Sequence, residues 1–159
     1  MKNISKMLNI IIGTRDQIMN RAIVEAIDNI TQYTHENRYG LEGWKTNSGY
    51  LLTKKFIVTR VAEKDWNGST VSVRSSIFTD RIIDLTKAIC YVTGKNFDEI
   101  PNYYTLSYLA TNTWHDWGVF EFKVFKKGTA HFKFKDDKDW ELINRSYAKI
   151  KGQVLPEKL

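Results

Sequence analysis

Residues 119–135 read VFEFKVFKKGTAHFKFK and alternate apolar with charged or polar side chains on both sides of a Lys-Lys-Gly-Thr turn. Apolar residues at every second position are typical of a strand with one buried face, and two such runs around a glycine predict an antiparallel hairpin. Because successive side chains point to opposite faces, one face of this hairpin has to pack on a core. The rest of the chain must therefore supply a layer that covers it.

The length of the turn decides which residues of the two strands lie opposite one another. The alternating pattern therefore selects the turn that pairs apolar residues with apolar ones. A two-residue turn at Lys127-Gly128 would place Phe122 opposite Lys133 and mix apolar and charged faces. A three-residue loop over 126–128 keeps the faces separate and puts Gly128 at a left-handed position beside a bulge. The expected partners are Phe120 with Phe134, Phe122 with Phe132, Val124 with Ala130, Glu121 with Lys133, and Lys123 with His131.

Helical periodicity predicts three main helices, over about 14–33, 77–93 and 137–151. Thr14 and Gln17 resemble a capping box, and Gly13 is expected to separate this helix from residues 4–12, which form either an earlier helix or a strand. Ser75 or Ser76 caps the second helix. Glycines end the second and third helices, at Gly94 and Gly152.

A second hairpin is expected upstream, with a strand over 55–62, a turn at Asn67-Gly68 and a return strand over 70–73. Residues 96–108 are expected to be irregular or to form short helical turns. We therefore predict one α+β domain over 1–159, in which three main helices pack on a small antiparallel sheet made of two hairpins. Residues 119–151 supply its C-terminal hairpin and helix, and residues 153–159 an extended tail.

The formal net charge is +6, from 24 Lys and Arg against 18 Asp and Glu. Such a surplus favours an anionic partner, nucleic acid above all, although a basic protein without that role has the same composition. The apolar run at 7–12 is too short to span a membrane, and no signal-peptide cleavage pattern accompanies it. We expect a cytoplasmic protein without membrane contact.

The polar face and loop of the C-terminal hairpin are the candidate nucleic-acid site. Lysines neutralise phosphates, and an aromatic ring can stack on a base. The residues expected to bind nucleic acid are Lys123, Phe125, Lys126, Lys127, His131, Lys133 and Lys135, with Phe125 as the stacking ring. The alternative is a solvated face whose lysines prevent edge-to-edge aggregation. Five further aromatic residues could stack on bases or sugars, or form the rim of a core: Tyr103, Tyr104, Tyr108, Trp114 and Trp117.

A catalytic alternative rests on Glu121-Phe122-Lys123, which has the Glu-x-Lys form of Mg²⁺-dependent nucleases. Such a site needs a second carboxylate, for which Asp116 is the nearest candidate. His131 is a candidate general base. An ion pair with Lys133 is a simpler role for Glu121. No zinc-ligand spacing or glycine-rich phosphate loop is present. We expect no metal and no cofactor, and a binding protein rather than an enzyme.

The stretch FEFKVFKKGTAHFKFKD, Trp140 and Asn144 in the next helix, and the ending AKIKGQVLPE resemble domain-of-unknown-function family 4942. The resemblance implies a protein of phages, plasmids or integrative elements, sometimes joined to or beside a DNA methyltransferase. It implies no catalytic residues, and this chain carries no methyltransferase motif.

The expected function is therefore a mobile-element accessory protein that binds nucleic acid, DNA rather than RNA, through the basic hairpin face, in DNA modification or anti-restriction. Two alternatives stay open: a protein-binding inhibitor or adaptor of a host defence system, and the Mg²⁺-dependent nuclease.

Overall fold

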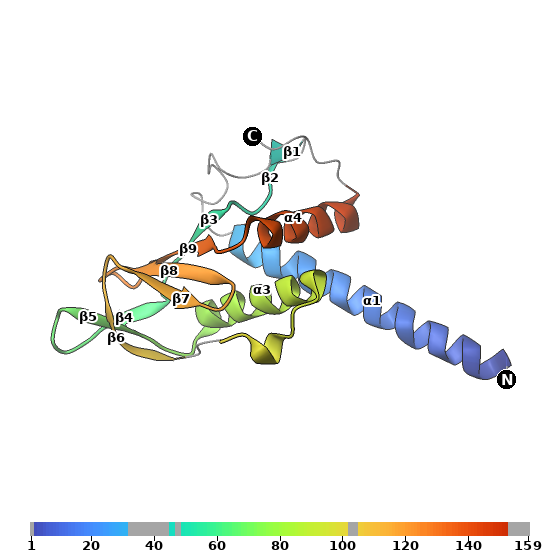
Figure 1. The fold of residues 1–159 in the computed structure, drawn as a ribbon, viewed down its shortest axis with the longest axis horizontal. Helices are drawn as coiled ribbons and strands as arrows, with labels where there is room; N and C mark the ends of the chain where they lie inside the picture. Colours follow the sequence, from blue (N-terminus) through green and yellow to red (C-terminus); the bar gives the residue numbers. More distant parts are fainter. Residues whose placement is uncertain (1, 32–44, 47–48, 102–104, 153–159) are drawn as a thin grey trace.

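The computed structural model describes residues 2–31, 45–46, 49–101 and 105–152 (Figure 1). Its helices are α1 (Lys2–Thr31), α3 (Ile77–Thr93), α4 (Asp137–Lys151) and the short 3-10 helix η1 (Phe97–Glu99). Its strands are β1 (Lys45–Thr46), β2 (Gly49–Tyr50), β3 (Lys55–Val58), β4 (Ala62–Lys64), β5 (Thr70–Val73), β6 (Leu106–Ala110), β7 (Trp114–Trp117), β8 (Phe120–Val124) and β9 (Ala130–Phe134). The α+β class is confirmed.

The strands form two main antiparallel sheets. One has four strands in the order β3-β9-β8-β7 and the other three in the order β4-β5-β6, while β1 pairs with β2. The predicted C-terminal hairpin is β8–β9, and all five expected cross-strand pairs are present. The Phe125 amide donates to the Thr129 carbonyl at 3.0 Å, which closes a three-residue loop over 126–128. Gly128 has the predicted left-handed conformation, with φ 91°.

The predicted strand over 55–62 is wrong, because the chain turns a corner within it. β3 ends at Val58 and β4 begins at Ala62, and the two strands belong to different sheets. Arg60 adopts a left-handed φ of 58° at this corner. The amides of Val61 and Ala62 both donate to the Gly128 carbonyl, at 2.8 and 3.1 Å. These long-range hydrogen bonds divert the chain. The Asn67-Gly68 turn is confirmed, but it joins β4 to β5.

The sequence analysis predicted none of four strands, the two-residue β1 and β2 and the longer β6 and β7. The pairing of β5 with β6 contains a register irregularity between Val71 and Val73, and Tyr108 there has a φ of 55°. The Tyr108 amide donates to Ser72 Oγ at 3.1 Å instead of to a ladder carbonyl. A strand interrupted in this way lacks a clean alternation of side chains, which explains why the sequence pattern predicts irregular structure over 96–108. Tyr103, Tyr104 and the tail over 153–159 lie outside the described residues.

The first helix starts at Lys2 instead of Thr14, and Gly13 lies inside it. A glycine in a helix interior costs only about 1 kcal/mol, which is too little to break a helix of this length. The described side chains at 4–10 and 13–18 are all exposed, and residues 2–18 project from the body of the molecule (Figure 1). We call this part the α1 arm. Among the described residues, α1 included, no helix combines the length and apolar character needed to cross a membrane.

The second and third predicted helices are confirmed. Ser76 caps α3 in a capping box with Thr79, and Asp136 caps α4. Gly94 and Gly152 end these helices in the left-handed conformation.

One buried cluster joins the helices to the inner face of the four-stranded sheet. Burial alternates strictly along β8 and β9, so that every second side chain enters the core. The largest fully buried side chains of this sheet are Phe56, Trp117, Phe120, Phe122 and Phe132. Trp117, an expected stacking candidate, is therefore a core residue. The remaining side chains of the sheet form an outer face, on which the predicted site lies.

Candidate nucleic-acid interface on the outer face of the four-stranded sheet

The strand register places the outer-face side chains in two rows. Both rows cross the sheet in the order β3, β9, β8, β7. The first row is Lys55, Lys133, Glu121 and Asp116, and the second is Ile57, His131, Lys123 and Trp114. Together these eight residues define the outer face. The sequence prediction had five of them in a candidate site, but it assigned no role there to Lys55 or Ile57, because the pairing of β3 with β9 joins segments far apart in the chain.

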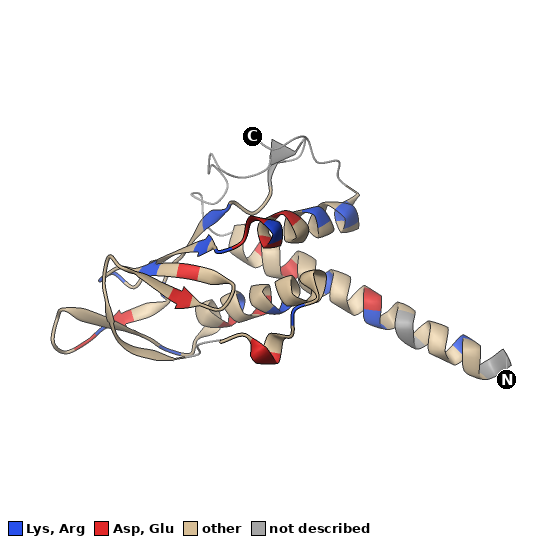
Figure 2. Cartoon of the chain, in the orientation of Figure 1, with Lys and Arg blue, Asp and Glu red and all other residues tan. Residues whose placement is uncertain are grey.

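The first row is balanced in charge. Lys133 Nζ lies 3.4 Å from Glu121 Oε2, as expected, and Lys135 Nζ lies 2.9 Å from Asp116 Oδ1. Figure 2 shows basic and acidic residues on the same strands of this sheet. The side chains of both lysines are about one-third exposed, and such surface ion pairs contribute only about 0–1 kcal/mol. A phosphate could compete with either carboxylate, but these two lysines are not free cations.

Trp114 lies at the β7 end of the second row, where two lysines contact its ring. Lys123 Nζ lies 4.8 Å and Lys133 Nζ 4.5 Å from its ring centroid, both within cation–π distance. The Trp114 side chain keeps 37% of its surface exposed. The sequence prediction had Trp114 only among general stacking candidates, since nothing in the local pattern shows that β7 lies beside β8. The indole holds the two ammonium groups near one another on the outer face.

His131 is a poor cation in this position. Burial lowers the pKa of its imidazole, and the neighbouring Lys123 ammonium lowers it further. Its ring contacts the Phe125 ring, with centroids 4.7 Å apart. Part of the Phe125 surface that was expected to stack on a base is thus occupied by His131. A neutral imidazole can still donate one hydrogen bond to a phosphate oxygen.

The 126–128 loop carries two exposed cations of the predicted site. Lys126 and Lys127 are exposed, and within the described part of the chain neither forms an ion pair. The backbone of this loop is held in place, because the Gly128 carbonyl accepts hydrogen bonds from the amides of Val61 and Ala62. This places two lysines on a fixed backbone at one end of the outer face.

The nuclease candidates are also brought together. Asp116 lies directly opposite Glu121 on neighbouring strands, and Lys123 is one row away. Each carboxylate has a lysine partner, and the described residues contain no group of three His, Cys, Asp or Glu side chains able to hold a metal ion. His131 lies opposite Lys123 rather than beside the carboxylates. The arrangement can bind an anion more readily than a cation.

Comparison with known proteins adds one result. The family model described as Domain of unknown function (DUF4942) matches residues 1–153. No curated protein and no solved structure matches the chain.

Proposed function

Since this chain belongs to the DUF4942 family, a domain of unknown function, we propose its role from its surface: the outer face and the 126–128 loop bind a nucleic-acid strand, with DNA preferred over RNA. The observation that carries the proposal is the pair Lys126 and Lys127, exposed and without ion pairs among the described residues, on a loop fixed by two backbone hydrogen bonds. Lysines on a preorganised backbone can contact phosphates without the loss of conformational entropy that ordering a flexible loop would cost.

The remaining residues extend the contact along the sheet. Lys55 and Lys123 lie on the outer face, at the edge strand β3 and near Trp114. The exposed part of the Trp114 indole offers a surface to a base, a contact worth about 1–3 kcal/mol. His131, Lys133 and Lys135 can add hydrogen bonds or exchange a carboxylate for a phosphate. The carboxylates reduce the positive potential, which favours a moderate affinity suited to an accessory protein of a mobile element.

A second candidate is the protein-binding adaptor, which the α1 arm favours. It exposes a series of large apolar side chains: Ile4, Met7, Leu8, Ile10 and Ile18. Exposed apolar clusters of this kind mark interaction surfaces. The two roles are compatible, because the arm and the outer face lie on different elements. The Mg²⁺-dependent nuclease is the third candidate, favoured by the cross-strand placement of Asp116 and Glu121.

The test is binding of labelled single- and double-stranded DNA, and of the corresponding RNA, across a salt series. The variant Lys126→Gln/Lys127→Gln is compared with Lys149→Gln/Lys151→Gln, which removes the same charge from the far end of α4. Loss of two phosphate contacts should lower the salt slope of log K for a single strand by about 1.4, whereas the control keeps it. Absence of binding at low salt, or equal losses in both variants, would refute the proposal. Cleavage on adding Mg²⁺ would favour the nuclease.

A further inference from the structure

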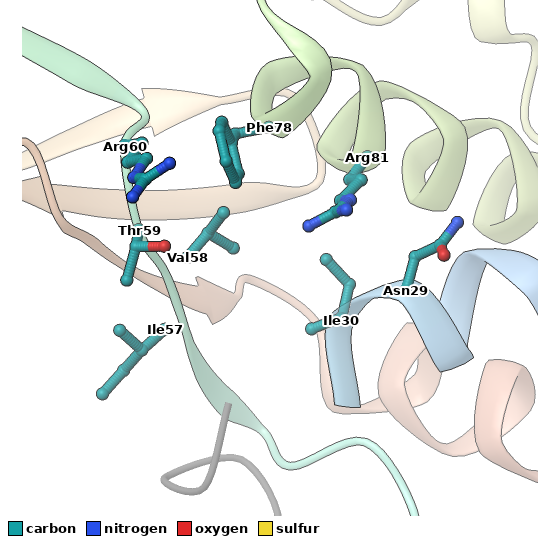
Figure 3. Close-up of a pocket in the computed structure, with 8 residues that line it drawn as sticks. All are labelled: Asn29, Ile30, Ile57, Val58, Thr59, Arg60, Phe78 and Arg81. Carbon is teal, nitrogen blue, oxygen red and sulfur yellow. The ribbon is translucent and has the colours of Figure 1, made fainter. Parts of the chain in front are cut away.

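A cavity of about 280 Å³ lies between the end of α1, the corner that follows β3 and the first turn of α3 (Figure 3). The residues that line it are Asn29, Ile30, Ile57, Val58, Thr59, Arg60, Phe78 and Arg81. This volume is close to the lower end of the range for small-molecule sites. Ile30, Ile57 and Val58 form an apolar wall, Phe78 adds an aromatic ring, and the other four residues are polar or cationic.

Two arginines converge on this cavity from separate elements. Arg60 Cζ lies 5.8 Å and Arg81 Cζ 5.3 Å from the centroid of the Phe78 ring. In Figure 3 their guanidinium groups extend from opposite sides toward the space between them. None of the described residues that line the cavity is acidic. Two guanidinium groups beside one aromatic ring, with no carboxylate among the described lining residues, favour an anion as the ligand of this cavity.

The position of Arg60 is fixed by the backbone. Its left-handed φ of 58° is unusual for a residue other than glycine, and such residues cluster at functional sites. The next two amides, of Val61 and Ala62, are held by the Gly128 carbonyl. The 126–128 loop therefore holds the corner from which Arg60 enters the cavity. The cavity also meets the outer face through Ile57, which pairs with His131.

We propose that this cavity binds the terminal phosphate of a nucleic-acid strand that lies on the outer face. The inference rests on the proposed function and adds the end of the strand to it. Arg60 and Arg81 would bind the phosphate oxygens through paired N–H donors, the geometry that favours arginine over lysine at phosphates. Asn29 and Thr59 offer further hydrogen bonds, and the apolar wall accommodates the terminal sugar and base. A free nucleotide carries the same phosphate group, so the test has to distinguish the end of a strand from a free nucleotide.

The experiment measures the affinity of short, internally labelled DNA strands that differ only in their ends: 5′-phosphate, 3′-phosphate or hydroxyl at both ends. The wild-type chain should bind one phosphorylated strand about tenfold more tightly than the hydroxyl strand, since charge-assisted hydrogen bonds are involved. Arg60→Gln/Arg81→Gln should lose this preference but still bind the hydroxyl strand. Arg15→Gln, on the exposed α1 arm, should keep it. Circular dichroism and urea unfolding confirm that each variant is folded.

Equal affinity for all three strands, or a preference that persists in the double variant, would overturn the inference and leave the proposed function intact. If no strand binds even at low salt, the proposed function fails, and the cavity is tested separately by calorimetric titration with adenosine monophosphate, inorganic phosphate and adenosine. Binding of the monophosphate that Arg60→Gln/Arg81→Gln abolishes would then assign the cavity to a free nucleotide. No heat with any of them would refute an anion site.

Discussion

Asn144 in α4 forms two hydrogen bonds with the backbone of Leu52: its Oδ1 accepts from the Leu52 amide at 3.0 Å, and its Nδ2 donates to the Leu52 carbonyl at 3.2 Å. The Trp140 indole donates to the same carbonyl at 2.9 Å. All of these groups are buried. The segment that leads into β3 is thus held on α4 by side chains that satisfy its backbone.

Asn144→Ala should lower the free energy of unfolding by about 2–3 kcal/mol, because the buried Leu52 amide loses its acceptor. Urea unfolding followed by circular dichroism measures the change. Asn20→Ala, at an exposed position on α1, is the control and should leave stability within about 0.5 kcal/mol of the wild type. Similar small effects in both variants would show that the Asn144–Leu52 contact contributes little.

Gly128→Ala should destabilise the protein more than Gly94→Ala. Both glycines have a left-handed φ, which an alanine adopts at a cost of about 1–2 kcal/mol. An added Cβ at Gly94 meets open space, whereas at Gly128 it would overlap the Ala62 carbonyl oxygen. Overpacking against backbone adds about 1–3 kcal/mol. Equal unfolding midpoints would contradict the docking of the loop on the corner between the sheets.

His131 should make stability depend on pH. Its folded-state pKa lies below the ordinary value of 6.5, so the unfolded chain binds the proton more readily. Stability is therefore full above that ordinary value and falls as pH drops from there toward the lowered pKa. His131→Gln should remove this part of the dependence, measured by urea unfolding from about pH 8 to about pH 5.

The cause of this shift can be tested by NMR titration of the imidazole. Lys123→Gln should raise the pKa of His131 toward its ordinary value, although burial continues to lower it. An unchanged titration in that variant would exclude Lys123 as a contributor.

Asp116→Asn should tighten DNA binding by about two- to fivefold, since it frees Lys135 from a surface ion pair. Asp98→Asn, which adds the same charge on the exposed η1, serves as the control. Anisotropy titrations at low salt measure both. Weaker binding in Asp116→Asn would contradict the phosphate-contact model, and Mg²⁺-dependent cleavage lost in this variant would instead support the nuclease.

The sequence predicted the β8–β9 register because its information is local. The phenylalanines and lysines of that hairpin alternate around one glycine, and parity leaves one register compatible with a sealed apolar face. The bounds of α3 and α4 could also be predicted, because local signals mark the helix ends: Ser76, Gly94, Asp136 and Gly152. The Glu121–Lys133 pair followed from the same register.

Features that depend on distant segments could not be predicted. Nothing around Arg60 shows that Gly128 diverts the chain there, and the convergence of Arg60 with Arg81 depends on that corner. The pairing of Asp116 with Lys135 requires β7 to lie beside β8, and Trp114 enters the site for the same reason. The balanced charge of the first row thus arises from the topology of the sheet and not from the hairpin alone.

The α1 arm has a consequence for the size of the particle in solution. A compact chain of this length has a radius of gyration of about 15 Å, while a helix over residues 2–18 adds a rod of about 25 Å on one side. Small-angle scattering from a monomer should therefore report a larger radius and an asymmetric distance distribution. A compact profile would mean that the arm folds back. The scattering curve thus distinguishes an extended arm, whose apolar side chains face water, from an arm that folds back on the body of the molecule.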